Sequence, residues 1–323
     1  MTIAEFSRPV IAPSGDNREG RAPSNCPLCG SASTTLKETF KTEPIIEAWR
    51  NQFGIDTREA FGGRPSFDLW ACERCSVQYF QPPELTGSPK LYEELSENDW
   101  YYQSQKWEHE VALKDLRGRR RILEIGCGSG GFILQAKQKE GLLIEGLEQN
   151  PRAIKEAQQR GLNVSSVDLE EIAAKRPEQY DAVCSFQVLE HVPRPMEFVK
   201  SCVALLSPGG VLLLGLPNLD SLLQYQFNIL DLPPHHMTRW SVQVLEYLPK
   251  AYPINLDAIR FEPLSLCRVG VYLDAHLGRF DHYRLVRRLR HSRLDGWLGK
   301  ALSLSGVRRL LRDQTFYAAF SRL

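Results

Sequence analysis

The sequence has no long apolar run and almost no net charge. Its 323 residues carry 40 basic and 39 acidic side chains, a formal charge of +1, so overall charge gives no reason to expect a DNA or membrane partner. The most apolar run, GGVLLLGLP at residues 209–217, is far shorter than the roughly 18 residues that span a bilayer. No internal repeat is present, and the first 20 residues resemble neither a secretory signal nor a transit peptide. We therefore expect a cytoplasmic globular protein, with a disordered tail over residues 1–24 that is rich in proline, glycine, serine and charge.

Four of the eight cysteines form two C-x-x-C pairs, in CPLCG and CERCS. A cytosolic chain keeps its cysteines reduced, and two such turns complete the tetrahedral shell of four sulfurs that structural zinc prefers. Four reduced core cysteines, or a redox dithiol, are the alternatives. The segment at residues 42–55 between the pairs has helical periodicity, which predicts a zinc-ribbon-like module with an inserted helix over residues 25–85. The predicted zinc ligands are Cys26, Cys29, Cys72 and Cys75.

The stretch RRILEIGCGSGGF at residues 120–132 ends a run of strand-forming residues in four glycines. Glycine weakens regular elements but lets a ligand approach the backbone closely. Gly126, Gly128 and Gly131 satisfy the G-x-G-x-x-G spacing of dinucleotide-binding folds, a pattern that by itself leaves nicotinamide, flavin and other nucleotide-like ligands open.

From residue 120 to residue 218, strand-like and helix-like segments alternate. Repeated units of this kind build an α/β fold with a doubly wound, mainly parallel sheet, whose ligands bind at the carboxyl ends of the strands. Three acidic residues occupy such positions: Glu124 precedes the first glycine, Glu148 ends the second strand and Asp168 ends the third. Singly, an acid after a strand is usually a solvated surface group; in this order the three indicate a ligand.

LEIGCGSGGF, GLEQNPRAI, VDLEEI and YDAVCSFQVLEHV, with the following segment to LPN, resemble successive motifs of the class I S-adenosylmethionine-dependent methyltransferases. The resemblance covers roughly Tyr101 to Ser241 and is nearest to bacterial small-molecule and sugar methyltransferases that carry an N-terminal zinc module. It implies a seven-stranded Rossmann-like sheet with an antiparallel last strand, for which TFYAAFSRL at residues 315–323 is the candidate. The methyltransferase domain would then cover residues 120–323, after a helical cofactor lid or linker over residues 86–119.

The same resemblance implies roles toward S-adenosylmethionine. Gly126, Gly128 and Gly130 would let the backbone approach the methionine part of the cofactor. Glu124 would order the glycine loop or the amino group of the cofactor. Gln187, at the end of the fourth strand, would lie beside the methionine part and the reaction centre.

The nucleoside end of the cofactor would meet two strand ends. Glu148 would take the ribose hydroxyls, Asp168 would accept from the adenine amino group, and Leu169 would pack near the ring. Ring faces attract a sulfonium cation, so the aromatic residues before the first strand would close over the cofactor, Tyr102 among them; alternatively they pack the zinc module onto the sheet. These aromatic residues are Trp100, Tyr101, Tyr102 and Trp107.

LPPHHMTRWS at residues 232–241 is similar to a histidine-containing loop of several zinc-bearing small-molecule and sugar methyltransferases. A histidine is suited to take a proton from a hydroxyl or an activated carbon. Adjacent side chains point in different directions, so one of the two is expected to act as the base. We favour His236 for its H-x-x-x-aromatic-Ser position over His235; helix capping and simple exposure are the alternatives. His191 is assigned a structural role.

The segment from about residue 268 to residue 312 has eleven basic and three acidic side chains, which is 11 − 3 = +8. Such a helical insertion would suit an anionic lipid surface, a nucleotide sugar or a phosphorylated glycan; a solvated helix face is the common alternative.

The expected function is methyl transfer from S-adenosylmethionine to a small molecule or a glycan or natural-product precursor. An RNA or protein methyltransferase is one alternative, although no N-P-P-Y-like tetrapeptide follows the fourth strand and the zinc module is mixed in charge. A non-catalytic cofactor-binding module is the other, disfavoured by the intact glycine loop.

Overall fold

The computed structural model describes residues 25–98, 101–102, 105–221, 228–278, 301 and 306–323. The tail expected over residues 1–24 and most of the expected basic segment lie outside the described residues. Both remain predictions.

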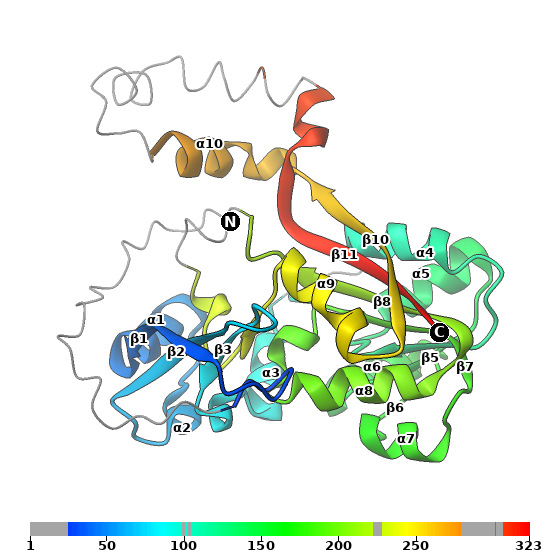
Figure 1. The fold of residues 1–323 in the computed structure, drawn as a ribbon, viewed down its shortest axis with the longest axis horizontal. Helices are drawn as coiled ribbons and strands as arrows, with labels where there is room; N and C mark the ends of the chain where they lie inside the picture. Colours follow the sequence, from blue (N-terminus) through cyan, green and yellow to red (C-terminus); the bar gives the residue numbers. More distant parts are fainter. Residues whose placement is uncertain (1–24, 99–100, 103–104, 222–227, 279–300, 302–305) are drawn as a thin grey trace.

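The N-terminal module is a four-stranded antiparallel sheet with helices beside it (Figure 1). The expected inserted helix is confirmed as α1 (Thr42–Phe53), which ends where Gly54 adopts a φ of +72°; a second, short helix is α2 (Arg58–Phe61). The strands, in spatial order, are β1 (Thr34–Lys41), β2 (Ser66–Cys72), β3 (Gln78–Gln81) and β9 (Thr238–Arg239).

Aromatic residues fill the core of this module. The rings of Phe40 and Phe67 stack 5.3 Å apart, and Trp49 is fully enclosed. Ile229, Leu232 and Met237 join the same core from the distant histidine loop. The module is therefore built from two separate stretches of the chain, and its packing fixes the histidine loop.

The methyltransferase-like region has the expected seven-stranded sheet, in the order β10-β11-β8-β7-β4-β5-β6. The expected antiparallel last strand is confirmed, because β11 pairs antiparallel with both β8 and β10. The other described pairs, from β8 to β6, are parallel. The strands are β4 (Ile122–Ile125), β5 (Ile144–Leu147), β6 (Val164–Ser165), β7 (Tyr180–Phe186), β8 (Leu206–Pro217), β10 (Ile254–Pro263) and β11 (Arg312–Arg322).

Helices cover both faces of this sheet, so the central strands are buried on both sides. All four residues of β4 are buried, and three of them are apolar, as expected for a strand that is covered on both faces; the fourth is Glu124. One face is covered by α4 (Trp107–Asp115), α5 (Gly131–Glu140) and α6 (Pro151–Gln159). The other is covered by α7 (Leu169–Lys175), α8 (Pro195–Leu205) and α9 (Val242–Ala251).

Short elements connect the two regions and carry residues of the site. Between β3 and α4 lie η1 (Pro83–Leu85) and α3 (Pro89–Leu95). After β7 comes the single turn η2 (Leu189–His191), and before β9 comes η4 (Ile229–Asp231).

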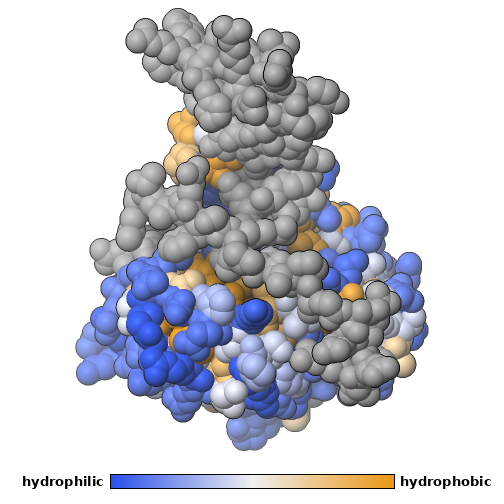
Figure 2. Space-filling model, turned by 90° about the vertical axis from the view of Figure 1, so that its left-hand side faces the viewer, coloured by the Kyte–Doolittle hydropathy of each residue, from blue (hydrophilic) through white to orange (hydrophobic). Residues whose placement is uncertain are grey.

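Strands β10 and β11 extend beyond the sheet as an arm (Figure 1) that carries η5 (Leu266–Arg268), α10 (Val269–Gly278) and η6 (Gly306–Leu310). Figure 2 shows hydrophobic residues at this arm above a largely hydrophilic lower face. Leu266, Val307 and Leu310 are exposed there. Within the described part of the chain, no helix is long and apolar enough to cross a membrane.

Candidate functional site

A cavity of about 450 Å³ lies at the carboxyl ends of β4, β5 and β7, the edge at which parallel sheets bind ligands. Six of the nine residues predicted to hold the cofactor contribute to its wall. Glu124 and Gly128 line a second, adjoining cavity instead, and Gly130 lines neither cavity. The predicted residues in the wall are Tyr102, Gly126, Glu148, Asp168, Leu169 and Gln187.

The glycine loop leaves no room for side chains. Gly126 has a φ of +70°, and a Cβ there would lie 2.3 Å from a methyl carbon of Val188. Gly130 has a φ of +81°, and a Cβ there would lie 2.3 Å from a methyl carbon of Leu162. Both positions combine a left-handed backbone with close packing, so glycine is required at each.

Glu148 ties the glycine loop to the end of β5. Its Oε2 accepts from the Gly128 N–H at 2.8 Å, and its Oε1 accepts from the N–H groups of Gln149 and Asn150 at 2.8 and 2.9 Å. A carboxylate has about four lone-pair positions, so this half-buried group can still accept from ribose hydroxyls. The arrangement fits the predicted role.

Asp168 is the N-cap of α7. Its Oδ1 accepts from the N–H groups of Glu170 and Glu171 at 2.8 and 3.2 Å. Its hydrogen bonds use Oδ1 alone within the part of the chain that the structure describes, which leaves Oδ2 for a donor such as an adenine amino group. Leu169 is the adjoining residue of the cavity wall.

Glu124 is buried beneath the glycine loop, and its Oε2 has no hydrogen-bond partner among the described residues. Burial raises the pKa of this carboxyl to about 8. An unpartnered buried carboxyl is costly, and an ammonium group of a bound amino acid would satisfy it. The site residues thus fit S-adenosylmethionine on their own geometry.

Gln187 stands between the two cavities with a φ of +59°. Its Nε2 donates to Oε1 of Glu108 at 3.2 Å. Glu108 is a buried carboxyl on α4 that the sequence did not single out. No motif marks it, because its contact with Gln187 spans 79 positions of the chain.

The second cavity, of about 400 Å³, shares Tyr101, Tyr102, Gly126, Gln187 and His191 with the first. It extends away from the nucleoside end toward the histidine loop. Its wall includes a group of titratable residues, here called the histidine cluster: Glu190, His191, Asp231, His235 and His236.

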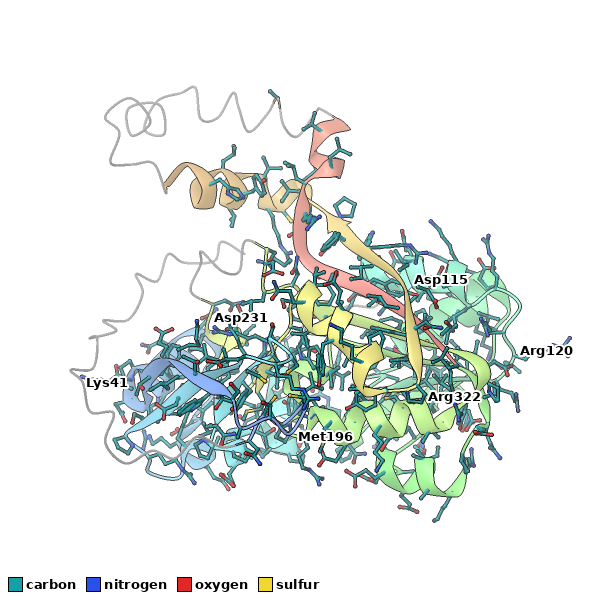
Figure 3. The ribbon with its side chains drawn as sticks, viewed as in Figure 1. Lys41, Asp115, Arg120, Met196, Asp231 and Arg322 are labelled. Carbon is teal, nitrogen blue, oxygen red and sulfur yellow. The ribbon has the colours of Figure 1, made fainter. Side chains whose placement is uncertain are left out.

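Backbone hydrogen bonds hold the histidine loop against η2. The Met237 N–H donates to the Glu190 carbonyl oxygen at 2.7 Å, and the Phe80 N–H of β3 donates to the Met237 carbonyl oxygen at 2.9 Å. The N-terminal module thereby positions His235 and His236 in the wall of the second cavity. Figure 3 shows Asp231 beside the N-terminal module.

The three histidine rings pack against one another. The His191 centroid lies 4.4 Å from that of His235 and 4.9 Å from that of His236. Burial lowers the pKa of His191 to about 3 and that of His235 well below its ordinary value. Both rings are therefore neutral near pH 7.

His236 contacts two carboxyl groups. Its Nδ1 lies 3.4 Å from Oδ1 of Asp231, and its Nε2 lies 4.0 Å from Oε1 of Glu190. Burial raises the pKa of Glu190 to about 7. His191, which was predicted to have a structural role, and Glu190, which the sequence did not single out, both line this cavity. Their place directly after a parallel strand could have signalled that position.

The aromatic residues before β4 lie where the two cavities meet. The Tyr101 hydroxyl is 3.3 Å from Nε2 of His235. The Tyr102 ring covers the backbone of Gly128, so that a Cβ on that glycine would lie 2.8 Å from it. Trp107 lines the second cavity, and Trp100 lies outside the described residues.

The four paired cysteines converge as predicted. Sγ of Cys26 is 3.6 Å from Sγ of Cys75, and Sγ of Cys29 is 3.5 Å from Sγ of Cys72; all four sulfurs lie within 4.8 Å of one another. Zinc–sulfur bonds of about 2.3 Å place the sulfurs of a tetrahedral site about 3.8 Å apart. The donor set therefore fits a closed zinc site.

Comparison with known proteins gives one family. A family model described as a methyltransferase domain matches residues 100–257. The ubiquinone biosynthesis O-methyltransferase of Xanthomonas campestris pv. campestris (strain B100) is 36% identical over 114 residues, 33% of this chain and 47% of that protein. The corresponding protein of Bordetella avium (strain 197N) is 37% identical over 111 residues, 32% of this chain and 45% of that protein.

The chain thus spans a little under half the length of the curated relatives it matches. Among solved structures, a SAM dependent methyltransferase from Archaeoglobus fulgidus is 20% identical with a TM-score of 0.45, over 73% of this chain and 100% of that one. The matched residues contain the glycine loop, the three strand-end acids and the histidine cluster. The family model and these relatives support a class I S-adenosylmethionine-dependent methyltransferase domain over residues 100–257.

Proposed function

We propose that this protein transfers the methyl group of S-adenosylmethionine to a hydroxyl oxygen of a small molecule bound in the cavity of about 400 Å³. The observation that carries the proposal is the junction of two cavities, one lined by residues predicted to hold the cofactor and one lined by the two candidate bases, His235 and His236. The names of the relatives, which are O-methyltransferases, support oxygen as the acceptor atom.

The cofactor would lie along the carboxyl edge of the sheet. Asp168 would accept from its adenine amino group, Glu148 from its ribose hydroxyls, and Glu124 would face its ammonium group. The bound sulfonium supplies an electrophilic methyl group. Gln187 and the Tyr102 ring would hold the methionine part at the junction of the cavities, because both line the two of them.

Displacement at the methyl carbon needs an acceptor oxygen that is aligned and deprotonated. His236 is the better placed of the two candidate bases, because the Asp231 carboxylate lies beside its Nδ1 and leaves Nε2 free to take a proton. His235 has a partner at each nitrogen, the Leu230 carbonyl oxygen at 2.9 Å and the Tyr101 hydroxyl at 3.3 Å. We therefore assign His235 a positioning role and His236 the proton transfer.

The four cysteines would hold a structural zinc ion. Three of them are buried in the core that includes Trp240 and the buried face of α9. Such a zinc ion would fix the N-terminal module to the methyltransferase domain, and the module fixes the histidine loop. Zinc is thereby a structural support for the acceptor cavity.

The test combines binding and turnover. Titration calorimetry with S-adenosylhomocysteine is expected to show micromolar binding, and labelled S-adenosylmethionine is expected to methylate members of a panel of phenols and sugar alcohols. The variant His236→Ala should keep its affinity for S-adenosylhomocysteine and lose about 100-fold or more in kcat. His276→Ala on α10, remote from both cavities, is the matched control. Unchanged kcat in His236→Ala would remove the proton-transfer assignment, and absence of cofactor binding in a folded sample would refute the proposed function.

A further inference from the structure

The Glu108 side chain reaches from α4 to the residue that directly follows β7. It is 3% exposed and lines the cavity of about 400 Å³. Gly215 in β8 makes room for it, because a Cβ at that glycine would lie 3.0 Å from Cγ of Glu108. The carbonyl oxygen of Gly215 also accepts from the backbone N–H of Gln187 at 2.8 Å. One small residue thereby lets Glu108 and Gln187 meet at the carboxyl end of β7.

The side chain of Gln187 is held in one orientation. Its backbone has a φ of +59°, in the left-handed region that a non-glycine residue seldom adopts, and such strain gathers at ligand sites. Its Nε2 donates to Oε1 of Glu108 at 3.2 Å. A carboxylate only accepts hydrogen bonds, so the amide must present its NH₂ group to Glu108 and not its oxygen. The acid therefore selects one of the two ways in which the amide can be turned.

The selected orientation leaves the amide oxygen for a ligand. Within the part of the chain that the structure describes, no hydrogen bond reaches Oε1 of Gln187. Gln187 also lines both cavities. An amide that gives its NH₂ group to the protein thus offers its oxygen to whatever occupies the junction of the two cavities.

We propose that Glu108 is a positioning residue, which turns the amide of Gln187 so that its carbonyl oxygen faces the methylated sulfonium of bound S-adenosylmethionine. A carbonyl oxygen carries partial negative charge, and polarised C–H bonds make weak C–H···O contacts with it. The opposite orientation would direct the NH₂ group toward a positive centre. The inference deepens the proposed function and rests on it for the place of the methionine part at the junction.

A direct attraction between the Glu108 charge and the sulfonium is the competing role. The two roles differ in what an amide at position 108 would do. Glu108→Gln keeps the shape of the side chain, removes its charge and can either accept from Gln187 or donate to it. The orientation of Gln187 is then lost only in part, whereas the charge is lost completely.

Binding of three ligands tests the orientation without turnover. S-adenosylhomocysteine lacks the methyl group and the sulfonium charge, S-adenosylmethionine has both, and sinefungin has a carbon with an ammonium group in place of the methylated sulfur. A carbonyl oxygen accepts a strong hydrogen bond from an ammonium group, so Glu108→Met should bind sinefungin about 10-fold more weakly by calorimetry. Its affinity for S-adenosylmethionine should fall about 2- to 5-fold, and that for S-adenosylhomocysteine should stay within about twofold.

Matched variants separate orientation from charge and from packing. Glu108→Gln should lose about twofold in sinefungin affinity, because both orientations of Gln187 remain open. Glu110→Met, at an exposed acid of the same helix, should bind all three ligands like the wild type. Gln187→Met should lose as much sinefungin affinity as Glu108→Met. The double variant should lose no more than either single variant, as expected when two residues act as a unit.

Three results would overturn the positioning role. They are equal losses of sinefungin affinity in Glu108→Gln and Glu108→Met, an unchanged sinefungin affinity in Glu108→Met, and losses that multiply in the double variant. If Glu108→Met does not fold, Gln187→Met carries the test, and a sinefungin affinity equal to that of the wild type overturns the proposal. Absence of binding of all three ligands to folded wild-type protein would instead refute the proposed function, and this inference with it.

Discussion

Replacement of Glu124 by glutamine should remove a pH dependence of stability from the cofactor-free protein. Glu124 is buried under the glycine loop, and desolvation raises its pKa from the ordinary 4.5 to about 8, with Lys106 opposing and Glu148 reinforcing the shift. Glutamine has nearly the same shape and cannot ionise. The variant therefore isolates the ionisation of this one side chain.

The sign follows from proton counting. Near pH 4 the folded and unfolded chains both keep the Glu124 proton, so the group contributes no pH dependence. Between about pH 5 and pH 8 the unfolded chain has lost that proton and the folded chain retains it, so the free energy of unfolding falls by about 1.4 kcal/mol per pH unit. Over three units the wild type should lose about 4 kcal/mol relative to Glu124→Gln. Above the folded pKa both states are ionised and the difference stays constant.

The assay is urea unfolding of the zinc-replete protein at several pH values from 5 to 8, compared between wild type and variant. Glu246→Gln, on the exposed side of α9, controls for the loss of a surface charge. If the free energy of unfolding changes with pH by the same amount in the wild type and in Glu124→Gln, the Glu124 carboxyl is not desolvated as described. Other titrating groups cancel in the difference.

Three further predictions concern the loop, the adenine end and zinc. Gly126→Ala should lose about 2 to 5 kcal/mol of stability in denaturant unfolding, because of left-handed strain and overpacking against Val188, and should bind S-adenosylhomocysteine poorly. The control is Gly141→Ala, where φ is +65° and a Cβ would have no neighbour within 4 Å. This control should lose only about 1 to 2 kcal/mol and bind S-adenosylhomocysteine normally. Asp168→Asn keeps the helix cap but turns a donor toward the adenine amino group, so calorimetry should show about 10- to 100-fold weaker binding at unchanged stability; equal affinity would contradict the assigned contact. Cys75→Ser should lose one zinc ion per chain by metal analysis and unfold at a lower urea concentration. Zinc that is retained in this variant would count against the site. The control is Cys202→Ser, at a buried cysteine outside the cysteine cluster.

The sequence by itself determined the features that depend on neighbours in the chain. An apolar run that ends in glycines and is followed by a helical period specifies a strand, a tight loop and a helix, because backbone sterics and side-chain periodicity act over a few residues. Glu148 and Asp168 follow the same rule, since the end of a parallel strand fixes the edge of the sheet that they occupy. The two C-x-x-C turns each orient their own pair of sulfurs.

Only the tertiary structure decided which of these local features meet. Glu190 and His236 are 46 positions apart and come together because the histidine loop hydrogen-bonds to η2 on one side and to β3 on the other. Glu108 reaches Gln187, and β9 completes the sheet of the N-terminal module, by contacts that no local pattern encodes. Such contacts depend on the summed packing of distant apolar surfaces, and burial then sets the protonation of Glu124, Glu190 and His191. The chemistry of the acceptor cavity is therefore a property of the fold, although the residues that supply it are written in short motifs.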